Sequence, residues 1–273
     1  MKQKILFVMK ESVAWLFCIF FAYPFLYAIT TSLKSQQNFF ENPYSLFARY
    51  SLVNYVETVQ NGFLFFFMNS IIVLVLSVAL VVALSSLVSY GLERIDFGCN
   101  KWLSVLLVSG MMLPVHASLI PIFVLENKWH IYDTLFGAAI PQVAFAIPIS
   151  IFIVSQFVST IPVSLFEAAK IDGASHPQIF QKVAFPLLQP AIVTIIIYNG
   201  VRIWNNFSFP LIFIQSRSKY TIPLGLQDFY GEYSVNVPGI LSAIIIATIP
   251  LVVIYFLLQD SIEAGLTGGA VKE

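Results

Sequence analysis

Six long apolar segments, separated by shorter polar stretches, define the pattern along this 273-residue chain. A helix needs about 20 mostly apolar residues to cross the hydrocarbon core of a membrane. The segments that meet this requirement are residues 13–33, 64–89, 102–125, 135–158, 190–214 and 239–258. They are predicted to be helices, because lipid offers the peptide backbone no hydrogen-bond partners. The sequence therefore predicts an all-α polytopic membrane protein, with residues 1–273 forming a single transmembrane domain.

The first apolar segment follows three lysines, Lys2, Lys4 and Lys10, as the core of a signal peptide would. It is longer than the 7–15 apolar residues typical of such peptides, and it lacks a convincing cleavage site of small residues. We expect it to be a retained first span.

Composition agrees with a membrane protein. Apolar residues make up 58% of the chain and charged residues only 10%, whereas soluble domains carry about 25% charged residues. A soluble protein of this length needs far more charge to cover its surface. This composition excludes a disordered chain and most soluble enzymes. The formal net charge of zero leaves no strong field to attract nucleic acid.

Lysine and arginine in the loops predict the orientation, because cytoplasmic loops carry an excess of them. With the N-terminus inside, the inner set is Lys2, Lys4, Lys10, Arg94, Lys101, Lys170, Lys182 and Lys272. The outer set is Lys34, Arg49, Lys128, Arg217 and Lys219. The inner loops would then carry eight lysines and arginines and the outer loops five, which favours cytoplasmic N- and C-termini.

Local motifs for catalysis are absent from the sequence. It contains no HExxH metal motif, no phosphate-binding GxxxxGK[ST] loop and no GxSxG nucleophile elbow. The two cysteines, Cys18 and Cys99, have no metal-like spacing, and the three histidines are isolated from one another. We expect no catalytic residues, and no metal or cofactor bound by this chain.

One inner loop, residues 159–189, is long enough to form structure of its own. Pro162 suits the start of a helix, Gly173 permits a left-handed stop, and Ser175 can cap a second short helix. The pattern of the first helix predicts one apolar patch made by Leu165, Phe166, Ala169 and Ile171. From these residues alone, two interpretations stay open. The loop is either a helical hairpin resting on lipid headgroups or an element that docks into a partner.

The string Glu167-Ala-Ala-x-x-Asp-Gly-Ala174, followed by Phe180 and Pro186, closely resembles the EAA loop of permease subunits in bacterial ATP-binding-cassette (ABC) importers. The resemblance extends over nearly the whole chain. It includes Asn69-Ser70, Tyr90-Gly-Leu-Glu-Arg94, Met112-Leu-Pro114 and Trp204-Asn-Asn-Phe207. The C-terminal Gly265-Leu-Thr-Gly-Gly-Ala-Val-Lys272 resembles the carbohydrate-uptake branch related to the smaller maltose-transport permease. Asn206 departs from that branch, which often has an acid there.

The resemblance implies the fold of a type I ABC importer transmembrane domain in the bacterial cytoplasmic membrane. It implies a permease that moves a sugar or oligosaccharide and is not itself an enzyme. The implied partners are a second, different permease chain, an external solute-binding protein and two cytosolic ATPase subunits, which hold ATP and magnesium. Nucleic acid is not an expected partner.

The resemblance also assigns residues. Coupling to the ATPase falls on Glu167, Ala168, Ala169, Asp172, Gly173 and Ala174, although Asp172-Gly173 is also explained as a plain helix stop. Contact of the tail with the ATPase falls on Gly268, Gly269 and Lys272. The last outer loop, residues 219–236, is expected to contact the binding protein.

Polar residues recur at helical spacing in the fifth span, which is costly inside a membrane. They are Asn199, Arg202, Asn205 and Asn206, beside Trp204. One interpretation is a cavity face in the substrate pathway, where amides bind sugar hydroxyls and Trp204 offers a stacking surface. The other is adhesion between helices. An isolated histidine, His116, is expected to be structural.

Other functions compete with a sugar importer. A stand-alone secondary transporter would need a membrane-embedded carboxylate, and the predicted spans contain none near their middles. An intramembrane enzyme would need a nucleophile with a base, or a metal. An ABC importer permease for a non-sugar solute also remains open.

Overall fold

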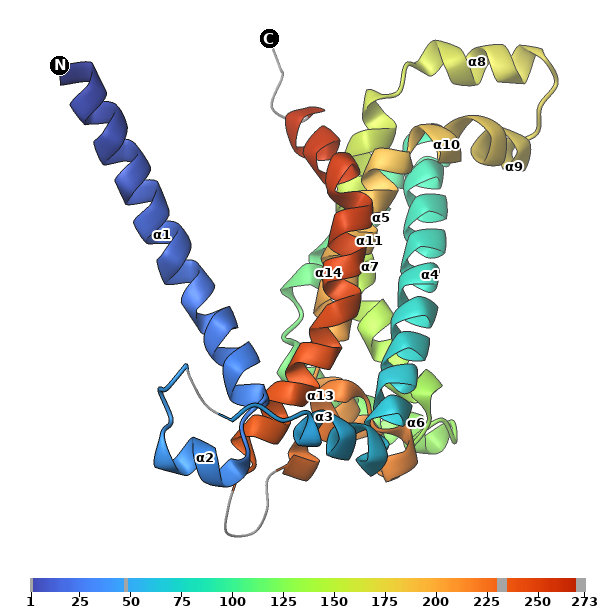
Figure 1. The fold of residues 1–273 in the computed structure, drawn as a ribbon. Coiled ribbons are helices and arrows are strands. Elements are labelled where there is room, and N and C mark those ends of the chain that lie inside the picture. Colours follow the sequence, from blue (N-terminus) through green and yellow to red (C-terminus); the bar gives the residue numbers. More distant parts are fainter. Residues whose placement is uncertain (1, 47–48, 230–234, 269–273) are drawn as a thin grey trace. The chain divides into compact units, whose positions relative to one another are not determined.

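The computed structural model describes residues 2–46, 49–229 and 235–268, and helices dominate these ranges (Figure 1). The α-helices, in chain order, are α1 (Lys2–Ser32), α2 (Gln36–Glu41), α3 (Val53–Thr58), α4 (Leu64–Arg94), α5 (Asn100–Ser109), α6 (Val115–Lys128), α7 (Leu135–Thr160), α8 (Val163–Ile171), α9 (His176–Ile179), α10 (Phe185–Leu187), α11 (Gln189–Trp204), α12 (Ser208–Phe213), α13 (Ile222–Gly225) and α14 (Val237–Gly268). The all-α prediction is confirmed.

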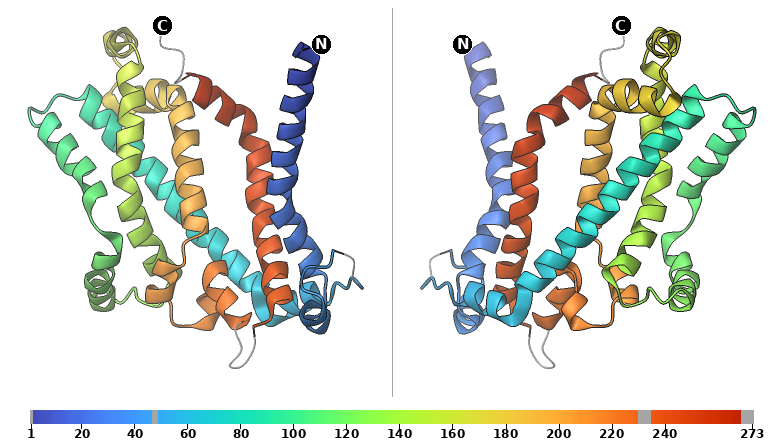
Figure 2. Two further views of the ribbon diagram at one scale, coloured as in Figure 1. Left: turned by 90° about the vertical axis from the view of Figure 1, so that its left-hand side faces the viewer. Right: turned by 90° about the vertical axis from the view of Figure 1, so that its right-hand side faces the viewer.

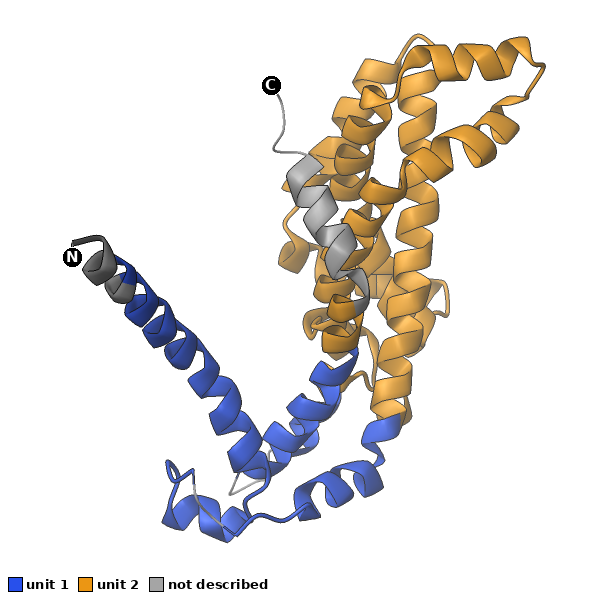
Figure 3. Cartoon of the chain, turned by 45° about the horizontal axis from the view of Figure 1, so that its top comes forward, with its two compact units in different colours: residues 1–64, 225–250 blue, residues 65–224, 251–273 orange. Residues whose placement is uncertain are grey.

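The chain divides into two compact units (Figure 3). The first comprises residues 1–64 and 225–250, and the second comprises residues 65–224 and 251–273. A single membrane domain over the whole chain stays a prediction, and each unit is described by itself.

Four helical segments are long and apolar enough to cross a membrane: Lys10–Ser32, Val53–Arg94, Leu135–Thr160 and Val237–Phe256. Two bent helix pairs raise this number to six if each pair is counted as one span. The pattern of apolar segments therefore predicted the multi-pass architecture.

The predicted span at 102–125 is not one helix. The segments Asn100–Met112 and Val115–Lys128 meet at an angle of 100°, and in Figure 2 α6 is seen nearly end-on at the foot of α5. Leu113 adopts an extended conformation (ψ 126°). The following residue, Pro114, disfavours a helical conformation at the residue before it.

The predicted span at 190–214 also ends early, because α11 stops at Trp204 and α12 begins at Ser208. Asn206 accepts a hydrogen bond from Phe209 N through Oδ1 at 3.0 Å. An Asn side chain that bonds the backbone three residues onward starts a new helix instead of continuing the old one.

In the second unit, α7 packs against α5 and α11. Gly110, at the end of α5, permits part of this close approach, since a Cβ there would lie 2.9 Å from Pro148 Cγ. A buried cluster joins the ends of α4, α7 and α11 to the loop that carries α8 and α9. Its largest members are Tyr90, Phe166, Ile179, Leu188 and Ile195.

In the first unit, hydrogen bonds tie the segments together. Asn54 Nδ2 donates to the carbonyls of Ser32 and Lys34, at 2.7 Å each. Thr58 Oγ1 and Ser242 Oγ lie 2.8 Å apart and form a hydrogen bond. Lys34, one of the charges assigned above to the outer loops, is buried and donates to the carbonyl of Asn42. Burial lowers the pKa of its ammonium group.

Candidate coupling loop and polar pocket

The loop that carries α8 and α9 folds as its sequence predicts. Pro162 (ψ 130°) stands directly before α8, and Gly173 ends that helix with a φ of 79°, the left-handed region that favours glycine. Ser175 and Gln178 then form a capping box at the start of α9, in which Ser175 N donates to Gln178 Oε1 at 2.8 Å. Figure 1 shows α8 and α9 projecting together beyond the end of α4.

Arg94, the last residue of α4, fastens this loop to the transmembrane helices. Its Nη2 donates to the carbonyl of Ile161 at 2.6 Å and also to the carbonyl of Val158. The guanidinium carbon lies 4.5 Å from the centre of the Phe166 ring on α8, a cation–π arrangement. One side chain therefore links α4, the end of α7 and α8.

Tyr90 makes a second attachment, one turn earlier on α4. Its hydroxyl lies 3.3 Å from Nδ1 of His176 on α9. Its ring lies 6.3 Å from that of Phe166 and 5.4 Å from that of Phe180. Both helices of the loop are thus held by side chains of α4.

The predicted apolar patch on α8 is wrong as a single patch. Phe166 is 4% exposed and Ala169 is half-buried, whereas Leu165 is 44% and Ile171 86% exposed. Residues three apart share one face of a helix, so Phe166 and Ala169 face the core while the other two face away.

The predicted coupling residues divide in the same way. Exposed members are Glu167, Ala168, Asp172 and Gly173, and half-buried members are Ala169 and Ala174. Of the predicted tail contacts, Gly268 is the last residue of α14, and Gly269 and Lys272 lie outside the described residues.

At the opposite end of α7, Asp133 organises the segment that follows α12. Its carboxylate accepts hydrogen bonds from Gln215 N at 2.9 Å and from Ser216 N at 2.8 Å. Ser216 Oγ donates to it at 2.5 Å, and Lys219 Nζ forms a salt bridge at 2.9 Å. Asn69 holds the same segment from α4, donating to the carbonyls of Ser218 and Tyr220.

Burial of the Asp133 carboxyl acts to raise its pKa, but the hydrogen bonds from Ser216, Lys219 and Gln215 outweigh burial and hold the pKa below its ordinary value. A carboxyl with a lowered folded-state pKa stabilises the fold above its unfolded-state pKa, about 3.9. That stabilisation is lost as the pH falls toward the folded-state pKa.

Asp133→Asn is therefore expected to lower the stability of the detergent-solubilised protein by about 2 kcal/mol at pH 7. The difference from the wild type should shrink as the pH falls below about 4. Thermal unfolding across this pH range measures both effects. Asp96→Asn is the control, since that carboxylate accepts from Gly98 N in an exposed loop. A difference that stays constant with pH would contradict the assignment.

A polar pocket of about 270 Å³ lies among α6, α7, α11 and α12. Three of the predicted substrate-pathway residues line it, namely Asn199, Arg202 and Asn206. Two others do not. Trp204 packs edge-on against Phe67 with ring centres 5.8 Å apart, and Asn205 Nδ2 donates to the carbonyl of Val201. The predicted row of polar residues is split between the pocket and other surroundings because α11 ends at Trp204, so the helical spacing does not continue beyond it.

Two polar residues of this pocket, Asn199 and Arg202, form hydrogen bonds with other side chains of the protein. Asn199 is buried and donates to Ser150 Oγ on α7 at 2.9 Å, which is the helix adhesion that the sequence left open. Arg202 Nη1 donates to Tyr198 OH at 3.1 Å, and its guanidinium lies over that ring.

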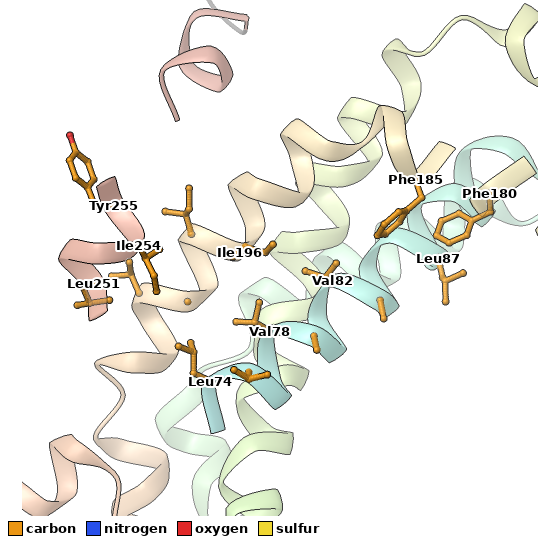
Figure 4. A pocket seen from close by; sticks show the side chains of 16 residues that line it. Leu74, Val78, Val82, Leu87, Phe180, Phe185, Ile196, Leu251, Ile254 and Tyr255 are labelled. Carbon is orange, nitrogen blue, oxygen red and sulfur yellow. The ribbon is translucent and has the colours of Figure 1, made fainter. Parts of the chain in front are cut away.

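A second, larger hollow of about 830 Å³ lies along α4, α11 and residues 251–255 of α14. Its described lining is aliphatic or aromatic, and the Tyr255 hydroxyl supplies its single side-chain oxygen (Figure 4). Such a surface suits lipid tails or another apolar helix and offers a polar solute almost nothing. Among the described residues, no group of three His, Cys, Asp or Glu side chains is placed to hold a metal ion.

Comparison with known families decides the identity. Residues 99–268, which include the polar pocket and the loop of α8 and α9, match the model for binding-protein-dependent transport system inner membrane components. The chain belongs to this family. It is a permease component of an ABC importer, a multi-pass protein of the inner membrane.

Relatives of this permease match it over most of its length. A protein of Caldicellulosiruptor sp. strain Rt8B.4 described as a putative ABC transporter permease, ORF2, is 37% identical, over 96% of this chain and 98% of its own. The melibiose/raffinose/stachyose import permease MelC of Bacillus subtilis is 34% identical, over 91% of each chain.

The permease fold also has a solved counterpart. One chain of a bacterial ABC transporter involved in import of the acidic polysaccharide alginate superposes with a TM-score of 0.82. It is 21% identical, and the match covers 95% of this chain and 97% of that one. This likeness establishes the fold of a type I ABC importer permease.

Sequence reasoning missed four residues that shape these two regions of the permease. Tyr90 and Arg94 were named in the resemblance, and Arg94 also as an inner charge, but nothing local in the sequence shows that they reach a loop some 70 to 90 residues away. His116 and Gln142 line the polar pocket. The signal for Gln142 was present, because an amide within a long apolar run needs a polar environment.

Proposed function

We propose that this permease imports a sugar or oligosaccharide delivered by an external solute-binding protein. It would pair with a second, different permease chain and with two cytosolic ATP-binding subunits. ATP and magnesium would be held by those subunits, so this chain would catalyse no reaction and bind no cofactor. The observation that carries the proposal is the projecting loop of α8 and α9, fastened to transmembrane helix α4 by Arg94 and Tyr90.

The surface of α8 suits docking into a protein cleft. Two apolar side chains of the projecting helix α8 are exposed: Ile171 is 86% exposed and Val163 is 54% exposed. Exposed apolar side chains grouped on a projecting element mark an interaction site. Ala168 and Gly173 are small, which permits close approach, and Glu167 and Asp172 offer charges.

Carbohydrate as the substrate class rests on the relatives. Their descriptions name melibiose, raffinose and stachyose, arabino-oligosaccharides, and trehalose and maltose. A non-sugar solute is the second candidate, because one solved structure of similar fold belongs to a methionine transporter.

The anchored loop gives a route for coupling. When the ATP-binding subunits close, they would move α8 and α9, and Arg94 would transmit this movement to α4. A packed helix moves as a unit, so the pathway switches between two arrangements. This scheme places the loop and both termini in the cytoplasm, in agreement with the distribution of lysine and arginine. Gly268, Gly269 and Lys272 would contact the ATPase there, and residues 219–236 would meet the binding protein outside.

Gly173→Val tests the coupling role. A β-branched residue at a φ of 79° is strained, so the turn between α8 and α9 must change shape. We expect sugar uptake, and the ATP hydrolysis that the binding protein stimulates, to fall by about tenfold, since the strain is about 1–2 kcal/mol. Both are measured in proteoliposomes that contain the full complex.

Gly98→Val is a matched control, because Gly98 has a φ of 77° and open space around it but lies between α4 and α5. Equal loss in both variants would refute a specific role for Gly173. Uptake by this chain alone, without ATP-binding subunits, would instead support a secondary transporter.

A further inference from the structure

One side chain that lines the polar pocket carries a buried polar atom without a hydrogen-bond partner among the described residues. Gln142 on α7 is 5% exposed and lines the pocket. Its Nε2 donates to the carbonyl of Ala138 at 2.8 Å, within its own helix. Its Oε1 is buried and finds no hydrogen-bond partner among the described residues.

A buried acceptor without a partner costs free energy, and native proteins rarely leave one unsatisfied. Helix adhesion does not explain Gln142, since within the described part of the chain its side chain bonds only to its own helix, whereas Asn199 bonds across to Ser150. An incoming donor, such as a hydroxyl group, would satisfy Oε1.

The rest of the pocket has the composition that a sugar ring requires. Arg202, His116 and Asn206 supply polar groups, while the rings of Phe145 and Phe209, 5.9 Å apart, form an apolar wall. A sugar presents hydroxyls at its edge and C–H groups on its face, so it needs both kinds of surface. A volume of about 270 Å³ lies just below the usual range for drug-sized ligands, about 300–1,000 Å³, so it suits one monosaccharide unit.

We propose that this pocket is a subsite for one monosaccharide unit of the transported sugar, and that Gln142 Oε1 accepts a hydrogen bond from one of its hydroxyls. The proposal rests on the proposed function, since it assumes a carbohydrate substrate. It makes Gln142 a specificity-determining residue.

The test uses the full complex with its binding protein in proteoliposomes. Maltose, raffinose and arabinotriose are first screened for uptake. The imported sugar is then compared with its monodeoxy analogues, each lacking one hydroxyl, in the wild type, Gln142→Leu and Gln156→Leu. Gln156 is the matched control, because it lies on the same helix and is exposed. The same binding protein serves all three complexes, so its own discrimination cancels.

We expect one analogue to be imported about fivefold more slowly than the parent sugar by the wild type and by Gln156→Leu, as the loss of one neutral hydrogen bond predicts. Gln142→Leu should import both at similar, reduced rates. Gln142→Glu keeps an acceptor and should retain discrimination. Arg202→Gln, at the exposed edge of the pocket, should slow uptake even if Gln142→Leu fails to reach the membrane.

Two results would overturn the subsite. Equal discrimination in Gln142→Leu and Gln156→Leu would show that Oε1 bonds only water, and unchanged uptake in Arg202→Gln would show that no solute uses the pocket. If the wild-type complex imports no carbohydrate but another solute, the proposed function fails and the sugar subsite fails with it.

Discussion

Replacing Arg94 with methionine is expected to separate ATP hydrolysis from transport. The variant loses two charge-assisted hydrogen bonds, to the carbonyls of Ile161 and Val158, and the cation–π contact with Phe166. Together these contribute about 3 kcal/mol to holding the loop on α4. The loop can still dock on the ATPase, but its movement no longer reaches the transmembrane helices. Uptake should fall by at least about tenfold, while ATP hydrolysis falls much less.

Parallel measurement of uptake and ATP hydrolysis in proteoliposomes checks this prediction. Lys101→Met is the control, because it removes an exposed cation at the neighbouring start of α5. Arg94→Lys should be intermediate, since a lysine has no planar fork with which to reach two carbonyls. If hydrolysis and uptake fall in equal proportion while the chain remains in the membrane, Arg94 does not transmit movement.

Gly137→Ala is expected to prevent the protein from accumulating. A Cβ at this position would lie 2.4 Å from the carbonyl oxygen of Ile131 and 2.9 Å from Glu126 Oε2. The carbonyl cannot retreat, because it also accepts a hydrogen bond from Thr134 Oγ1 at 2.6 Å, and this hydroxyl in turn caps α7 at Gly137 N. Overpacking of this kind costs about 3 kcal/mol, a large fraction of the stability of a typical domain.

The amount of protein in membranes and its thermal unfolding temperature measure the effect of Gly137→Ala. Gly91→Ala is the control, since Gly91 lies in α4 and an alanine methyl group there would meet no atom within 4 Å. That change should stabilise the protein by up to about 1 kcal/mol, because alanine favours a helix more than glycine does. Equal stability of Gly137→Ala and the wild type would contradict the tight contact.

The apolar segments were sufficient to predict a multi-pass protein because each has at least the roughly 20 residues that a bilayer requires. Two of the predicted spans, residues 102–125 and 190–214, are broken in the structure, and each break has a local cause. Pro114 bends the third segment, and the Asn206 side chain starts a new helix after the fifth. Both residues were visible in the sequence, but an apolar window averages over the single residue that breaks a helix.

Local turn chemistry was predicted well in the loop of α8 and α9, where Gly173 and Ser175 act through their own backbone geometry. Contacts between distant segments could not be predicted in this way. The hydrogen bond from Arg94 to Ile161 joins residues 67 positions apart, and the one from Ser216 to Asp133 joins residues 83 positions apart. Of the polar face predicted for the fifth span, only part lines the pocket, because the predicted spacing assumes a helix that continues past Trp204.

The short length of α11 has a consequence for the barrier that a solute must cross. Its 16 residues rise about 24 Å, less than the hydrocarbon thickness of about 30 Å. The non-helical backbone at residues 205–207 therefore falls at membrane depth, where it is tolerated only inside protein or beside water. Where water lines this break in the helix, the dry layer is thinner, and a conformational switch there has to move a solute across only part of the bilayer.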